Sequence, residues 1–144
     1  MNILAIDDSK TAALMIKNAL KEHQVTTANN GEEGISAIKL NDHFDLVLLD
    51  WQMPIMDGPG FLKVLQADRF TYTPIIVLTA EQKIEKIFDL MKLGVDVGVI
   101  DYINKPFTPS TLQKKIRDIQ PKVMRYKAFA SAIDEYRKKK MVND

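Results

Sequence analysis

The stretch Leu46-Val47-Leu48-Leu49-Asp50 decides the fold class. A nearly continuous apolar run is typical of a strand buried on both faces of a parallel sheet, and here it ends in a carboxylate. Three further apolar runs are each followed by polar residues: Ile3-Leu4-Ala5-Ile6 by Asp7-Asp8, Ile75-Ile76-Val77-Leu78 by Thr79, and Tyr102-Ile103 closely by Lys105-Pro106. If these runs are neighbouring parallel strands, three carboxylates, a hydroxyl and an ammonium meet at one sheet edge.

Strands and helices alternate along the chain. Apolar runs predict strands at 2–6, 45–49, 74–78 and 99–103, and a short β-rich stretch predicts another at 25–28. Caps and helical spacing predict helices at 10–22, 31–40, 59–68, 82–93 and 109–119, with cap residues Ser9, Asn30 and Thr108. In the fourth helix Ile84, Ile87, Phe88 and Met91 are expected to form the core face. This alternation predicts an α/β protein with a doubly wound, five-stranded parallel sheet and helices on both faces.

Length and composition exclude several classes of protein. The 144 residues suit one globular domain with a sizeable core. No apolar run approaches the roughly 20 residues that cross a bilayer, and no signal peptide is recognisable, so a cytoplasmic location is expected. The absence of cysteine excludes disulfides, thiolate metal sites and a cysteine nucleophile.

The charge is divided unevenly along the chain. Residues 1–113 carry 15 acidic and 10 basic side chains, whereas residues 114–144 carry 4 acidic and 10 basic ones. We therefore expect a main domain over 1–120 and a basic helical extension or linker over 121–144, in which Pro121 begins a second helical stretch. The basic block favours a solvated helix face, although an acidic partner, nucleic acid or an anionic membrane would also suit it.

The polar residues at the strand ends suit phosphoryl transfer. Carboxylates about 4 Å apart repel by roughly 4 kcal/mol at an effective dielectric near 20, so three converging carboxylates call for a cation. Oxygen ligands without histidine or cysteine favour Mg²⁺. Asp50 is the best candidate nucleophile, with Lys105 as the fixed cation and Thr79 as the hydrogen-bond donor.

Four motifs resemble the receiver domain of two-component response regulators. They are Asp7-Asp8-Ser9, the stretch from Asp50 to Gly58, Thr79-Ala80, and the stretch from Asp101 to Phe107. The resemblance covers residues 2 to about 119, and the four motifs occur in the family's order. It implies a flavodoxin-like sheet with strand order 2-1-3-4-5, for which a chemotaxis regulator is a known example.

The resemblance also implies a role for each site residue. Asp50 would accept a phosphoryl group from a histidine kinase or phosphotransfer protein, as in a phosphorelay. Asp8, Asp50 and the backbone carbonyl of Gln52 would bind Mg²⁺, with Asp7 acting mostly through water. Lys105 would pair with the phosphoryl group, and a cis Lys105–Pro106 bond would aim its side chain at the site. Three further roles are implied: Thr79 and Tyr102 would form the conformational switch, and Gln52 and Glu81 would tune the acyl-phosphate lifetime.

One segment departs from the family pattern. The interval from Thr79 to Lys105 is longer than usual, and the excess lies near Met91 to Val99. Gly94 and Gly98 both resemble the glycine that normally ends the fourth helix. We expect an extra helical turn or a short loop here.

The extension offers a weak clue to output. Val123, Tyr126, Ala130 and Ile133 follow 3, 4, 3 spacing, with Phe129 and Tyr136 beside them. This stripe would suit either a homodimer through the C-terminal helix or a helix docked on its own domain. The expected partner is an output protein or a fused output domain, and neither nucleic acid nor a membrane is indicated.

Two other functions compete with a phosphorylation-switched receiver. The first is a constitutive protein-interaction adaptor or dimer module on a receiver fold, against which the complete set of site residues argues. The second is a Mg²⁺-dependent phosphatase, whose usual general acid two positions after the nucleophile is replaced here by Gln52. The switch is therefore favoured over an enzyme with external substrates.

Overall fold

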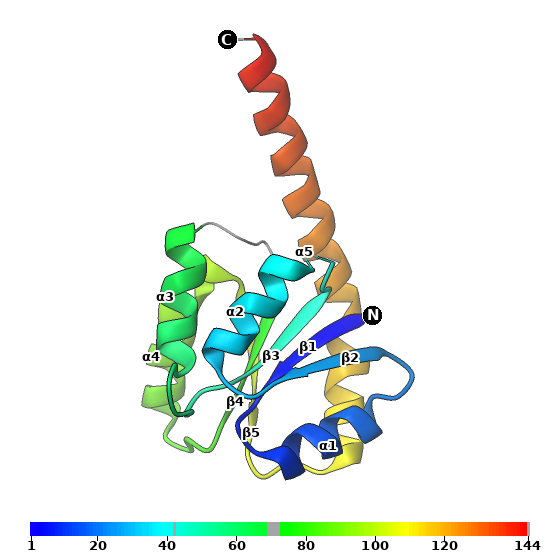
Figure 1. The fold of residues 1–144 in the computed structure, drawn as a ribbon, viewed down its shortest axis with the longest axis vertical. Helices are drawn as coiled ribbons and strands as arrows, with labels where there is room; N and C mark the ends of the chain where they lie inside the picture. Colours follow the sequence, from blue (N-terminus) through cyan, green and yellow to red (C-terminus); the bar gives the residue numbers. More distant parts are fainter. Residues whose placement is uncertain (42, 69–72, 144) are drawn as a thin grey trace.

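The computed structural model describes residues 1–41, 43–68 and 73–143, and it confirms the predicted doubly wound sheet. The five strands are β1 (Asn2–Ile6), β2 (Gln24–Ala28), β3 (Leu46–Asp50), β4 (Ile75–Thr79) and β5 (Val99–Asn104). All neighbouring strands are parallel, in the order β2-β1-β3-β4-β5 (Figure 1). The helices are α1 (Lys10–Ala19), α2 (Gly31–Leu40), α3 (Gly58–Asp68), α4 (Ile84–Gly94) and α5 (Pro109–Asn143).

Alternate residues of each strand enter two separate cores. Leu4 and Ile6 of β1 pack with α2, α3 and α4 on one face, whereas Ile3 and Ala5 pack with α1 and α5 on the other. Both sides of β3 and β4 are fully buried, as the continuous apolar runs predicted. Because the central strands are covered on both faces, their polar functional residues can lie only at the strand ends.

The predicted caps are present. Ser9 accepts a hydrogen bond from the Ala12 backbone N–H, Asn30 from that of Glu33, and Thr108 from that of Thr111. The first helix ends at Ala19, earlier than predicted, because the chain turns there towards β2 and the His23 N–H bonds the Leu20 carbonyl. The other element bounds lie close to their predictions, with α5 as the main exception.

The predicted core face of α4 is partly wrong. Ile87 and Leu90 are buried and Met91 is half-buried, but Ile84 and Phe88 are exposed. Gly94 explains why a different face of the helix is buried. A Cβ there would lie 2.3 Å from the Val99 side chain, so the glycine lets the end of α4 approach β5. The buried face therefore passes through Ile87, Leu90 and Gly94.

The excess residues before β5 form a 3₁₀ turn at Val95–Val97. The turn ends at Gly98, whose φ of 110° lies in the left-handed region. The pairing of β5 with β4 then shifts, because Ile75 pairs with Val99 while Ile76 pairs with Asp101, which leaves Ile100 as an extra residue. The longer segment thus ends in a bulge at the start of β5.

The C-terminal helix continues through Pro121 without a break, so the predicted second helical stretch is part of α5. Pro121 lies on the exposed side, where the carbonyl that loses a partner can be solvated. Ile119 and Val123 on either side of it are both buried in the core below α1 and α5. Packing on the same core stripe thus outweighs the helix-breaking tendency of proline. Beyond the sheet, α5 projects from the end where the strands begin (Figure 1).

Candidate functional site

Strand register brings the predicted acidic residues together. Ile6 of β1 pairs with Leu49 of β3, so Asp7 and Asp50 follow at the same level of the sheet. Their exposed fractions are only 1% and 5%, whereas Asp8 is exposed. One carboxylate oxygen from each of the three lies within 4.8 Å of the others. The site forms at the carboxyl ends of the strands because β1 and β3 are adjacent while their connections leave in opposite directions.

Lys105 lies between two of these carboxylates. Its ammonium Nζ is 2.8 Å from Asp7 Oδ2 and 3.1 Å from Asp50 Oδ1. The Lys105 backbone N–H donates to the Thr79 carbonyl at 2.7 Å, and the Lys105–Pro106 bond is cis, as predicted. Asp7 Oδ1 accepts in addition the Ser9 backbone N–H at 2.9 Å. These contacts hold the ammonium and the Asp7 carboxylate in fixed positions.

The environment shifts the ionisation of Asp50 and Lys105. Burial raises the pKa of Asp50 to about 6 from the ordinary 3.8; Lys105 opposes this rise, and the Asp7 and Asp8 carboxyls add to it. Burial alone would lower the pKa of Lys105, but its hydrogen bonds to Asp7 and Asp50 raise it. At neutral pH the site therefore has a firmly charged ammonium beside a mostly ionised but poorly solvated Asp50.

The donor set fits a hard divalent cation. Three carboxylates and one ammonium leave two formal negative charges when all are ionised, and every candidate ligand atom is oxygen. Mg²⁺ prefers such ligands and keeps several waters, for which the exposed Asp8 side of the cluster leaves access. The residues present therefore fit the cation that the sequence predicted.

Thr79 and Tyr102 lie on the strands next to this cluster. Thr79 is buried, and it follows Leu78, the β4 partner of Asp50. Its Oγ1 accepts the Glu81 backbone N–H at 3.0 Å, which leaves the hydroxyl hydrogen to donate elsewhere. Tyr102 pairs with Val77 and is half-buried against the α2–α3–α4 core. Because Thr79 ends β4 and Tyr102 lies in β5, a conformational change that begins at Asp50 could reach both residues through these strands.

The two residues expected to tune the site lie in loops. Gln52 is exposed, directly after the β3 carboxylate and Trp51. Glu81 is half-buried, and its Oε1 accepts the Lys83 backbone N–H at 3.0 Å before α4 begins. The structure thus places them after Asp50 and Thr79 respectively, outside the acidic cluster itself.

Sequence reasoning assigned no role to Asn104, which fixes the loop after Thr79. Its Nδ2 donates to the Glu81 carbonyl at 2.6 Å and to the Thr79 carbonyl at 3.4 Å. Asn104 pairs with Thr79 at the ends of β5 and β4. The feature of the sequence that could have indicated this role is a polar amide at the last strand position before Lys105.

The comparisons with known proteins agree with this geometry. Residues 3–117 match the response regulator receiver domain. This chain belongs to that family. Chemotaxis protein CheY-3 of Vibrio cholerae is 35% identical over 122 residues, covering 83% of this chain and 91% of the relative. Chemotaxis protein CheY of Pseudomonas aeruginosa is 34% identical over 126 residues, covering 85% and 98%.

Solved structures support the same assignment. The structure of chemotaxis response regulator CheY4 of Vibrio cholerae has a TM-score of 0.71 and 32% identity, covering 82% of this chain and 97% of that chain. A two-component response regulator from Clostridium difficile has a TM-score of 0.71 and 28% identity, covering 84% and 96%. The receiver fold therefore accounts for nearly the whole length of these two structures. Within the described residues, no helix of this receiver is both long enough and apolar enough to cross a bilayer.

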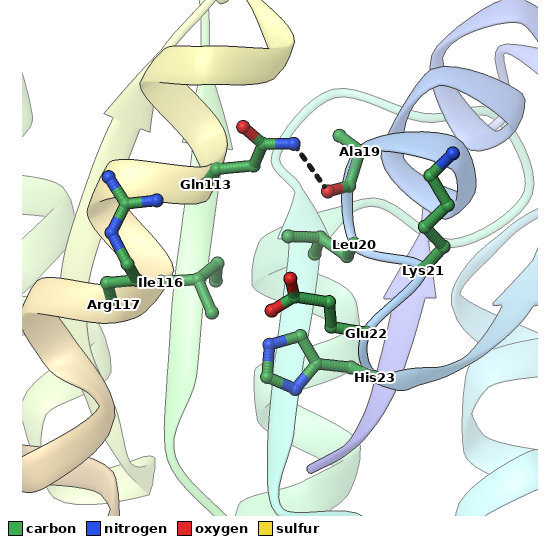
Figure 2. A pocket seen from close by; sticks show the side chains of 8 residues that line it. All are labelled: Ala19, Leu20, Lys21, Glu22, His23, Gln113, Ile116 and Arg117. Atoms are coloured by element: carbon green, nitrogen blue, oxygen red, sulfur yellow. Dashed lines mark hydrogen bonds between the residues drawn. The ribbon is translucent and has the colours of Figure 1, made fainter.

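A pocket of about 350 Å³ lies elsewhere on this receiver, between the end of α1 and α5 (Figure 2). Gln113 bridges its walls by donating to the Ala19 carbonyl at 2.9 Å, and His23 and Arg117 also line it. His23 immediately precedes β2, so the pocket lies near the amino-terminal strand ends. It is therefore separate from the acidic cluster at the opposite edge, and it carries none of the predicted site residues.

Proposed function

We propose that this chain is a phosphorylation-switched receiver that accepts a phosphoryl group on Asp50. The observation that carries the proposal is a buried carboxylate held 3.1 Å from a lysine ammonium, with two more carboxylates within ligand distance. Family membership supplies the reaction class, and the arrangement supplies a nucleophile, a fixed cation and a cluster suited to a metal ion. The protein would catalyse only its own phosphorylation and slow dephosphorylation.

The transfer step uses the Asp50 carboxylate as nucleophile. One of its oxygens attacks the phosphorus of a phosphohistidine on a kinase or phosphotransfer protein; a P–O bond forms as the P–N bond breaks. The departing imidazole keeps the bonding electron pair and takes up a proton. Lys105, already 3.1 Å from Asp50, would move its contact from the carboxylate to the incoming phosphoryl oxygens.

Mg²⁺ would be held by Asp8 and Asp50 of this cluster and by the backbone carbonyl of Gln52 in the loop after β3, with Asp7 acting through water. When bound, the ion would neutralise charge on the phosphoryl oxygens and orient them for in-line transfer. Asp7 has a second task in this protein, since it holds Lys105 at 2.8 Å and fixes the ammonium next to the acceptor. Loss of Asp7 should therefore affect both the metal and the lysine.

Phosphorylation would change partner binding through Thr79 and Tyr102. The Thr79 hydroxyl hydrogen is free to donate to a phosphoryl oxygen while Oγ1 still accepts the Glu81 N–H. An inward shift of Thr79 would pull the loop tied to Asn104 and open room for the half-buried Tyr102 ring. The result is a population shift between two states of the β4–α4 loop and β5. Gln52 and Glu81 would set how readily water reaches the acyl phosphate.

The partners follow from the same chemistry. The donor would be a histidine kinase or a phosphotransfer protein, and the target would be a separate output protein or a fused output domain. The match extends over 91% of CheY-3 and 98% of CheY, whereas it covers 50% of a 25% identical structure that is named as a probable two-component response regulator/GGDEF domain protein.

Acetyl phosphate with Mg²⁺ tests the proposal directly. We expect wild type to gain one phosphoryl group by intact-protein mass spectrometry and Asp50→Asn to gain none. Asp57→Asn is the matched control, because Asp57 is exposed in the loop after β3 and its Oδ1 cap of the Gly60 N–H can be kept by asparagine. Trp51, the only tryptophan, gives a second readout as beryllofluoride and Mg²⁺ are titrated.

The alternatives predict different results. Equal modification of wild type and Asp50→Asn would remove Asp50 as the acceptor. Partner binding that phosphorylation leaves unchanged would favour a constitutive adaptor on the receiver fold. Multiple turnovers of small phosphate esters would indicate a phosphatase instead.

A further inference from the structure

The part of α5 beyond the sheet is held on the domain by one side. Val123 is fully buried and Ala130 is buried. Lys122 Nζ donates to the Ile100 carbonyl at 3.2 Å, at the bulge of β5, and Lys127 forms an ion pair with Asp45 just before β3. The extension therefore packs on the domain as far as about residue 130, and these contacts fix the orientation of its other faces.

A narrow apolar stripe lies beside the face that packs on the domain. The exposed fractions of Phe129 and Tyr136 are 67% and 64%, and Ile133 between them is half-buried. At about 100° per residue, these three side chains fall within about 60° of one another around the helix. The 4, 3 spacing is that of a seam that packs against a single partner helix.

The charges that border this stripe all have one sign. Arg125 and Arg137 flank it on opposite sides, within about 80° of its centre, and Lys140 continues it one turn beyond Tyr136, with Nζ 5.9 Å from the Tyr136 ring centroid. Asp134 and Glu135 fall on other faces, more than about 100° from its centre. The stripe therefore combines an aromatic centre with a basic rim.

We infer that Phe129, Ile133 and Tyr136 with their basic rim form a docking surface for an acidic amphipathic helix of another protein. Apolar residues of such a helix would pack on the stripe, and its flanking glutamates or aspartates would face Arg125, Arg137 and Lys140. This surface lies on the part of α5 that projects beyond the end where the strands begin (Figure 1), whereas Asp50 ends β3 at the opposite edge, so basal docking does not depend on the proposed phosphoryl transfer.

Two other occupants fit the surface less well. A second copy of the helix would place like charges opposite one another on both sides of the seam, which disfavours a homodimer through this stripe. A helix lying in a membrane surface needs a broad apolar face. Here the remaining large exposed apolar side chains of the described part of α5, Met124, Met141 and Val142, point to other sides of the helix.

A pair of synthetic peptides tests the inference on the full chain. The first is a helix of about three heptads with leucine at the seam and glutamate on both flanks, and the second carries lysine in place of glutamate. We expect fluorescence anisotropy to show binding of the glutamate peptide with a dissociation constant at or below about 100 µM, weakened several-fold by about 0.5 M salt. The lysine peptide should bind at least tenfold more weakly, that is, by about 1.4 kcal/mol.

Variants locate the surface. Phe129→Ser with Tyr136→Ser should weaken binding of the glutamate peptide at least about tenfold, because both changes remove exposed apolar area from the seam. Met124→Ser is the matched control, since Met124 is exposed on another side of α5 and should change binding less than about twofold. Arg125→Glu with Lys140→Glu should reverse the preference between the two peptides, while circular dichroism confirms that the helix is retained.

Several results would overturn the inference. Equal binding of both peptides, or none at about 1 mM, would exclude an acidic helix as the occupant. A dimer in sedimentation that the double serine variant disperses would assign the stripe to a second copy. Binding to phosphatidylserine vesicles that the same variant abolishes, in the absence of peptide binding, would assign it to a membrane.

Discussion

At the scale of single residues, Asp50 should reduce stability in the metal-free protein. Its folded pKa of about 6 lies above the ordinary 3.8, so the folded state binds more protons than the unfolded state between these values. Stability therefore falls as pH rises through this window, and the loss is complete above about pH 6. Asp50→Asn should equal wild type in free energy of unfolding near pH 4 and exceed it by about 1–2 kcal/mol near pH 7.5.

Urea unfolding in EDTA at several pH values measures this difference. Asp57→Asn is the control for the loss of one carboxylate, because Asp57 is exposed in the loop after β3. Saturating Mg²⁺ should favour wild type and reverse the order near neutral pH, because binding to the folded state alone adds stability. An Asp50→Asn variant that is less stable than wild type near pH 7.5 in EDTA would contradict the prediction.

Much of the acidic cluster could be predicted from sequence. Asp7 and Asp50 end apolar runs, and a buried parallel strand leaves its polar residues no position except the end. The contacts of Asn104 could not be predicted, because they depend on how far the β4–α4 loop folds back over β5. Side-chain roles that require a phosphoryl group or a metal ion remain predictions.

At the scale of elements, helical periodicity was a weaker guide than strand ends. Apolar residues occupy more than one face of α4, so the spacing alone allowed Ile84 and Phe88 to be interpreted as core residues. The glycine contact between Gly94 and Val99 selected the buried face, and such a contact is not visible in a local pattern. In α5 the rule that proline ends helices failed for a similar reason, since buried residues on both sides of Pro121 hold the helix together.

The 3₁₀ turn after α4 ends at a glycine whose conformation and surroundings leave no room for a side chain. Gly98 has φ 110°, and a Cβ there would lie 2.9 Å from the Thr73 carbonyl oxygen and 3.0 Å from the Tyr126 hydroxyl oxygen. Gly98→Ala should therefore lower the free energy of unfolding by about 2 kcal/mol through backbone strain and crowding. Thermal and urea unfolding measure the loss.

Tyr126→Phe separates these two causes, because it removes only the hydroxyl. In the Tyr126→Phe background Gly98→Ala should cost less, by roughly 0.5–1 kcal/mol, if the hydroxyl crowds the new methyl group. An equal loss in both backgrounds would leave backbone strain and the Thr73 carbonyl as the cause.

The two departures from the usual receiver pattern, the longer segment before β5 and the extension of α5, lie in contact with each other. The extra residues before β5 produce Gly98 and the bulge at Ile100, and the extension of α5 contacts both places through Tyr126 and Lys122. A boundary near residue 120 remains our proposal for the end of the receiver domain. The first turns beyond it nevertheless share the receiver's core, since Val123 packs in the same cluster as Ile116.

Hydrogen exchange should therefore become faster along α5 where the contacts of the helix with the domain end, rather than at Pro121. Buried residues recur from Leu112 to Ala130, whereas every described residue from Asp134 onward is exposed. Amides up to about residue 130 should exchange slowly and those beyond about 134 quickly, because a helical segment with no buried side chain opens at little cost. Peptide-resolved exchange monitored by mass spectrometry measures this gradient.

Fast exchange beginning at Pro121 would mean that the contacts of α5 with β5 and Asp45 do not hold in solution. Slow exchange through residue 143 would mean that the distal turns are covered, and its dependence on protein concentration would separate a second copy from an intramolecular contact.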